Sequence, residues 1–95
     1  MNADTVTPET EILSRVIAPG DPSFTPEAAR SILELRFPDS DIVRMNELAA
    51  KAREGSLSRE EEAQLHGYMF VGSLVDLLHS KARLSLKRSV KDADG

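Results

Sequence analysis

Residues 65–86 read LHGYMFVGSLVDLLHSKARLSL. The stretch has no proline, and its apolar residues recur every three or four positions, as they do in an α-helix. Just before it, Ser58 and Glu61 have the spacing of a capping box, in which each residue can satisfy a backbone N–H of the other. We therefore predict one long helix over about residues 59–89, roughly 45 Å in length. A compact domain of this size has a diameter of only about 32 Å.

This long helix is apolar on more than one side. A first apolar stripe has heptad spacing and consists of Tyr68, Val71, Val75, Leu78 and Ala82. A second apolar stripe, about 140° further round at 100° per residue, consists of Phe70, Leu74, Leu77 and Leu84. Packing on one core needs an apolar arc of only about 100°. The first stripe can pack on the preceding helices, whereas the second needs another cover.

Three shorter helices are expected before the long one. The sequence Thr-Pro-Glu occurs at residues 7–9 and 25–27 and combines a hydroxyl N-cap with proline and an acid in the first turn. The first helix should stop at Ala18-Pro19-Gly20, and the second at about Arg36, before Phe37-Pro38.

A third helix should follow, capped by Asp39 or Ser40, with Gly55 as its left-handed C-cap residue. The fold prediction is thus all-α: a small bundle of three short helices and one long C-terminal helix. We expect a single helical domain over residues 7–90, between disordered ends at 1–6 and 91–95.

Composition excludes several classes of site. The 95 residues include no cysteine, so disulfides and thiolate metal sites are ruled out. The longest apolar stretch, residues 65–78, is shorter than the roughly 20 residues that span a bilayer. The N-terminus lacks the basic and apolar regions of a signal peptide. We therefore expect a cytoplasmic protein that is not inserted in a membrane.

No arrangement of side chains points to catalysis or to a cofactor. Glu62 and His66 lie four residues apart on the long helix, but no third metal ligand accompanies them. There is no phosphate-binding glycine loop and no nucleophile motif. The sequence thus predicts a protein that is not an enzyme, with no catalytic residue, no metal and no cofactor.

Charge is distributed unevenly along the chain, whose net charge is −4. Five basic residues and no acidic residue occupy positions 80–91, and they are Lys81, Arg83, Lys87, Arg88 and Lys91. They are candidates for contact with nucleic acid or with an acidic protein partner. However, the chain is acidic overall and no turn motif marks this helix as a recognition helix. A solvated helix end, whose cations suit the helix dipole, remains the alternative.

The second apolar stripe leaves two possibilities open. Either the first helix folds back and covers it, which closes a four-helix domain, or it forms an exposed patch of the kind that marks an interface. The candidate partner-interface residues are Phe70, Val71, Leu74, Leu77, Leu78, His79 and Leu84.

Four segments carry a family resemblance: ETEILSRVI at 9–17, PEAAR at 26–30, AREGSLS at 52–58 and SKARLSLK at 80–87. Together they resemble a family of small uncharacterised bacterial helical proteins, over residues 9–87. Members are often encoded directly beside an HNH-type endonuclease, in an antitoxin-like or immunity-like arrangement. They commonly have a polar residue where this chain has Met69-Phe70, so packing carries extra weight at that segment here.

The resemblance implies a protein that binds a co-encoded nuclease and neutralises or supports it. Charge permits this, because an acidic body can occupy a basic DNA-binding cleft. The acidic residues in question are Asp39, Asp41, Glu47, Glu54, Glu60, Glu61 and Glu62. Two alternatives remain open: a small dimeric regulator that contacts nucleic acid through the basic end of the long helix, and a structural homo-oligomer.

Overall fold

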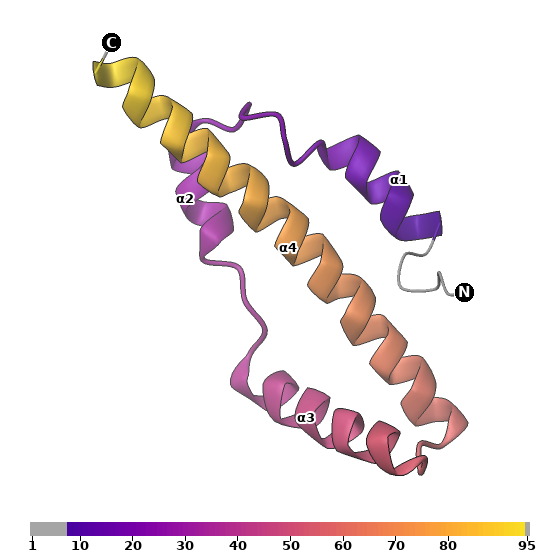
Figure 1. Cartoon of the computed structure of the whole chain (residues 1–95). Helices are drawn as coiled ribbons and strands as arrows, with labels where there is room; N and C mark the ends of the chain where they lie inside the picture. The colour runs from indigo at the N-terminus through magenta and orange to yellow at the C-terminus, as the bar shows by residue number, and fades with distance from the viewer. Residues whose placement is uncertain (1–7, 95) are drawn as a thin grey trace. The chain divides into compact units, whose positions relative to one another are not determined.

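A computed structural model describes the backbone of residues 8–94 and the side chains of residues 8–90. Its helices are α1 (Pro8–Ile17), α2 (Pro26–Leu33), α3 (Asp39–Glu54) and α4 (Arg59–Asp94), shown in Figure 1. The all-α prediction, three short helices and one long C-terminal helix, is confirmed, and no strand occurs among the described residues. The predicted disordered segment 1–6 and the N-cap at Thr7 lie outside those residues.

The predicted capping signals form in the structure. The Thr25 hydroxyl accepts the Ala28 N–H at 3.2 Å at the start of α2. At the start of α4 the Ser58 hydroxyl accepts the Glu61 N–H at 3.1 Å, and the Ser58 N–H donates to the Glu61 carboxylate at 3.0 Å. Gly55 ends α3 in the left-handed conformation, with a φ of 71°. These ends are decided locally, which is why the sequence predicts them.

Three helix ends differ from their predictions. Helix α2 ends at Leu33 and not near Arg36, because the next N–H groups turn back in a tighter i→i−3 pattern: Leu35 donates to Ile32 at 3.0 Å. Neither Asp39 nor Ser40 caps α3. Pro38 occupies the N-cap position, and its carbonyl accepts the N–H of Asp41.

Helix α4 continues to Asp94, five residues beyond the end expected near Ser89. The sequence has neither proline nor glycine between Gly72 and Gly95, so nothing interrupts the backbone ladder there. The predicted limits of a single domain at residues 7–90 stay a prediction.

The chain forms two compact units. Unit 1 comprises residues 1–35 and 73–95, and its described helices are α1, α2 and the C-terminal part of α4. Unit 2 comprises residues 36–72, with α3 and the N-terminal part of α4.

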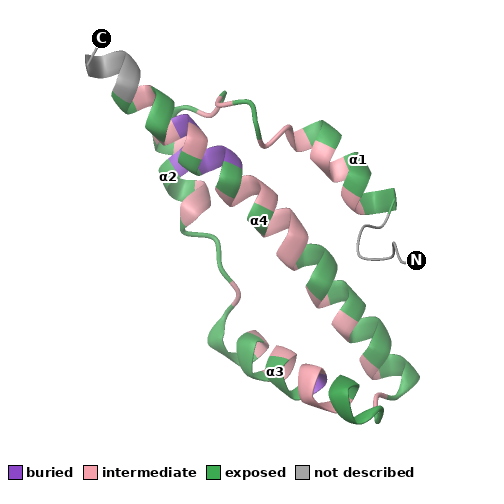
Figure 2. Ribbon diagram, viewed as in Figure 1, coloured by how far each residue is buried: buried purple, intermediate pink, exposed green. Residues whose placement is uncertain are grey.

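Small side chains hold unit 1 together. Figure 1 shows α1 on one side of α4 and α2 on another. Figure 2 shows buried residues, in purple, where α2 meets α4. Ala29 of α2 and Ala82 of α4 are completely buried, and Ser85 is 2% exposed. Because none of these side chains extends past Cβ by more than one atom, the two helix backbones can approach closely.

Unit 2 is a hairpin of α3 and the N-terminal part of α4. Leu48 is the one large side chain that is fully buried among the described residues. Phe37 and Tyr68 pack edge to face, with ring centroids 5.8 Å apart. The Tyr68 hydroxyl donates to Asp41 at 2.6 Å, and this bond to a carboxylate raises the pKa of Tyr68 above its usual value of 10.0. The hairpin thus has a very small apolar core.

Candidate interaction surfaces

Unit 2 leaves a set of large apolar side chains exposed, which we call the hairpin surface. On α4 it includes three consecutive residues, and on α3 two more. Its members are Ile42 (38% exposed), Val43 (57%), Met69 (61%), Phe70 (39%) and Val71 (42%). Three consecutive helical residues span about 200° at 100° per residue. A single neighbouring helix therefore cannot cover Met69, Phe70 and Val71 together.

Polar side chains join the two helices of the hairpin. The Arg44 guanidinium donates to Gln64 at 3.0 Å and lies 3.5 Å from the Glu61 carboxylate. Lys51 donates to the same carboxylate at 2.5 Å. This bond to Lys51, followed by that from the Ser58 N–H, lowers the pKa of Glu61 from 4.5 to about 2. Side-chain bonds of this kind hold α3 to α4 without using the apolar residues outside.

The structure divides the predicted partner-interface residues into two groups. Phe70 and Val71 are exposed and belong to unit 2. The others belong to unit 1 and are half-buried: Leu74, Leu77, Leu78, His79 and Leu84. In unit 1 the second apolar stripe is therefore partly covered. Figure 1 shows α1 beside α4, the helix that carries this stripe.

His79 has a structural bond that sequence reasoning did not find. Its Nε2 atom lies 2.9 Å from the carbonyl oxygen of Leu35, just after α2. A carbonyl oxygen can only accept, so this ring nitrogen carries a proton and donates. The bond ties the end of α2 to α4 within unit 1. Nothing in the sequence pairs these two positions, because they are 44 residues apart.

The hairpin surface also contains residues that the sequence analysis did not select. These exposed apolar residues are Ile42, Val43 and Met69. Met69 was not selected because it lies outside both apolar stripes of the long helix. Its position beside Phe70, where the resembled family commonly has a polar residue, was the available signal. For Val43 no comparable signal exists, because a valine on a helix is as compatible with a core as with a surface.

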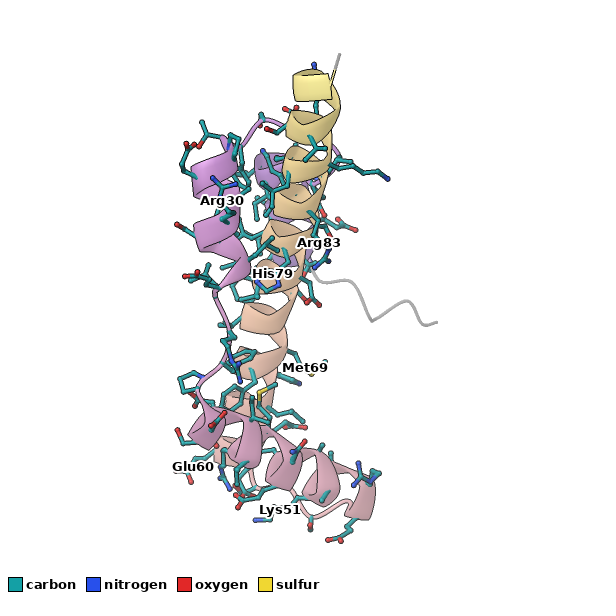
Figure 3. The ribbon with its side chains drawn as sticks, turned by 90° about the vertical axis from the view of Figure 1, so that its left-hand side faces the viewer. Arg30, Lys51, Glu60, Met69, His79 and Arg83 are labelled. Atoms are coloured by element: carbon teal, nitrogen blue, oxygen red, sulfur yellow. The ribbon has the colours of Figure 1, made fainter. Side chains whose placement is uncertain are left out.

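The predicted basic group is split by the fold. Lys81 is buried, its ammonium donates to the Ile17 carbonyl at 2.6 Å, and it lies 4.8 Å from the centroid of the Phe24 ring. An inward ammonium of this kind is not available to phosphate, so Lys81 does not fit the predicted contact. Arg83 and Lys87 are exposed, and Arg83 lies on the side of α4 away from α2 (Figure 3).

Arg88 and Lys91 are the other two basic candidates. Arg88 is exposed. The side chain of Lys91 lies outside the described residues.

Buried polar bonds in unit 1 explain why Lys81 turns inward. Ser85, 2% exposed, donates its hydroxyl proton to the Lys81 carbonyl at 2.7 Å and accepts the Phe24 N–H at 3.1 Å. The loop before α2 is thereby fixed against α4 with Phe24 beside Lys81. The aliphatic stem of Lys81 then covers apolar surface, and its ammonium donates to the Ile17 carbonyl at the end of α1.

Neither a metal site nor a membrane span is visible in the described part of the chain. Over residues 8–90 no three His, Cys, Asp or Glu side chains gather closely enough to hold a metal ion. None of the described helices combines the length and apolar character that crossing a bilayer requires.

Comparison with other proteins adds no relative. The chain matches no model of a known protein family, no curated protein and no solved structure. The resemblance to small helical proteins encoded beside HNH-type endonucleases therefore stays a prediction.

Proposed function

We propose that this chain is a non-enzymatic protein-interaction module that binds a partner protein through the hairpin surface of unit 2. The observation that carries the proposal is the exposure of five large apolar side chains on a unit with a single fully buried one, Leu48. Aromatic residues and methionine are enriched at protein interfaces, and a few buried anchors usually supply most of the binding energy. Phe70 and Met69 have that character.

The partner that we propose is a co-encoded nuclease of the HNH type, bound in an antitoxin-like manner. Two features support this choice: the family resemblance over residues 9–87, and the acidic net charge of unit 2. Residues 36–72 contain seven acidic and five basic side chains. The exposed acidic ones are Asp39, Glu47, Glu54, Glu60 and Glu62. This excess of acidic over basic side chains on unit 2 would steer the module toward a basic DNA-binding face.

Co-expression with the product of the neighbouring gene tests this proposal. A tagged chain should retain the nuclease through affinity purification and size exclusion at low salt. Phe70→Glu should abolish retention while leaving the helical circular dichroism unchanged, because it places a charge in the apolar contact. Asn46→Glu is the matched control, since it adds the same charge at an exposed polar position of α3. Separate elution of the two proteins, or loss of retention with both variants, would contradict the proposal.

A regulator that binds nucleic acid is the alternative, and one observation favours it. Arg83 and Lys87 are exposed and lie four residues apart on one side of α4, where both can reach neighbouring phosphates. This reading predicts a mobility shift on duplex DNA that weakens steeply with salt and is lost in Lys87→Glu. The absence of any shift at low salt would remove it. A purely structural homo-oligomer would form without either partner, which light scattering detects.

A further inference from the structure

Helix α1 uses only part of its apolar stripe against the rest of unit 1. None of its ten residues, all of which are described, is buried. Leu13 and Ile17 are half-buried, while Ile12 is 51% and Val16 75% exposed. Helices of this length are not stable alone in water. Helix α1 therefore depends on its contact with α4, yet this contact encloses little of it.

A hydrogen bond from α4 reaches α1 at its C-terminal end. The Lys81 ammonium donates to the carbonyl of Ile17, the last residue of α1. A cation at this position also favours the helix dipole, whose negative end lies at the C-terminus. Both partners are local features: a helix end and one inward lysine. The same bond can therefore form between α1 of one chain and α4 of another.

The connection after α1 is strained. Ala18 has a φ of 51°, in the left-handed region where glycine is the usual residue at the end of a helix. The chain then reverses through a bond from the Asp21 N–H to the Ala18 carbonyl at 2.9 Å, next to Pro19 and Pro22. A strained hinge that folds an element back on its own chain favours exchange of that element between chains.

From these observations we propose that α1 is exchanged between two copies of this chain, so that α1 of each copy packs on α4 of the other. The contacts of α1 are the same in the closed and in the exchanged form, including the bond from Lys81 to Ile17. The exchanged form releases Ala18 from its left-handed conformation, and each copy supplies the same element to the other, as a twofold dimer requires. This self-association involves unit 1 and does not depend on the proposed function, which rests on unit 2.

The oligomeric states of the wild type and of two variants test the exchange. Light scattering after size exclusion should show that the wild type dimerises as its concentration rises. Ala18→Gly should raise the dimer dissociation constant by about tenfold or more, because it removes the strain at both hinges of the closed form. A variant lacking residues 20–22 cannot easily reverse its chain, so it should be dimeric at lower concentration with unchanged helical circular dichroism.

Intermolecular energy transfer provides a second measurement, which does not need the shortened hinge to fold. The chain has no cysteine, so Ile12→Cys and Ser80→Cys each create one labelling site, on α1 and on α4. A mixture of chains labelled on α1 with chains labelled on α4 should reach the transfer efficiency of a single doubly labelled chain, after correction for label statistics. Exchange predicts this equality, because α1 occupies the same place on α4 in both forms.

Two results would overturn the exchange. One is a wild type that stays monomeric at every concentration and shows no intermolecular transfer. The other is a dimer that Phe70→Glu abolishes, since self-association would then run through the hairpin surface. Phe70→Glu should leave an exchanged dimer intact while it removes nuclease binding, so the two proposals can fail separately.

Discussion

The helices of the two units are held together by different kinds of contact. In unit 1, alanines and a serine bring α2 and α4 together, and buried side chains bond to backbone groups: Lys81 to Ile17, and Ser85 to Lys81 and Phe24. In unit 2, the side chains of α3 and α4 bond to one another, through Arg44, Lys51 and their acceptors.

The difference shows what residue size does to a small helical unit. Small residues at a contact let two backbones approach, so the polar groups of loops and helix ends become enclosed and need internal partners. Long polar residues bridge a wider separation from the outside. Apolar side chains that do not fit between the helices then stay in solvent, as Phe70 and Met69 do. This is why the inward lysine belongs to unit 1 and the exposed apolar surface to unit 2.

Leu48→Ala should have the largest effect on stability, and it should fall on unit 2. The change removes the one large side chain that is fully buried among the described residues, and such substitutions cost about 2–5 kcal/mol. Hydrogen exchange of the α3 amides measures the loss. Val43→Ala is the control: its side chain is 57% exposed, so its effect should stay within about 0.5 kcal/mol. Equal effects of the two changes would contradict the small core assigned to unit 2.

Lys81→Met should come next, and it should fall on unit 1. The methionine keeps an apolar stem but leaves the Ile17 carbonyl without its donor and removes the cation from the Phe24 ring. We expect a cost of about 1–3 kcal/mol, as for other hydrogen bonds to charged groups. Faster amide exchange in α1, with that of α3 unchanged, is the expected observation. Lys87→Met changes an exposed lysine of the same helix and should leave α1 unaffected.

Thr25→Ala should have a smaller effect, about 1 kcal/mol, because it removes the hydroxyl that accepts the Ala28 N–H at the start of α2. The loss belongs to unit 1, so chemical denaturation should show it together with faster exchange in the first turn of α2. Ser23→Ala, in the preceding loop, serves as the control. A null result for Thr25→Ala would mean that Pro26 alone is enough to start α2.

Acid should lower the stability of unit 2, and this should be the smallest of these effects. The pKa of Glu61 is lowered from 4.5 to about 2, chiefly by its hydrogen bond from Lys51. A lowered carboxyl pKa contributes stability that is complete above pH 4.5 and is lost as the pH falls toward about 2. Carbon NMR titration of the Glu61 carboxyl measures the pKa directly. In Lys51→Met it should move back toward 4.5; an unchanged value would show that Lys51 is not the cause.

Much of the fold followed from short segments. The helix starts at Thr25 and Ser58 and the end at Gly55 depend on residues three or four positions apart, and the structure contains all of them. The predicted cap of α3 was wrong because the helix already begins at Asp39, which places Pro38 in the N-cap position. The predicted end of α4 was wrong because no proline or glycine interrupts the helix after Gly72, so its backbone hydrogen bonds continue to Asp94.

The candidate surfaces could be predicted only in part. A long helix with apolar residues on too many sides was evident from residues 65–86, and Phe70 and Val71 were selected for that reason. The inward direction of Lys81 was not accessible, because its partner Ile17 is 64 residues away in the sequence. A basic residue in a basic segment is predicted to be solvated unless a distant carbonyl is known to lie beside it.

The sequence by itself therefore determined the helices of this protein, its lack of cysteine chemistry and the excess apolar character of its long helix, because these depend on composition and on spacings within one or two helical turns. Only the tertiary structure decided which apolar residues are covered and which cation is buried. Those outcomes depend on contacts between distant segments: Ala29 and Ala82 are buried where α2 meets α4, and Lys81 donates to the Ile17 carbonyl at the end of α1.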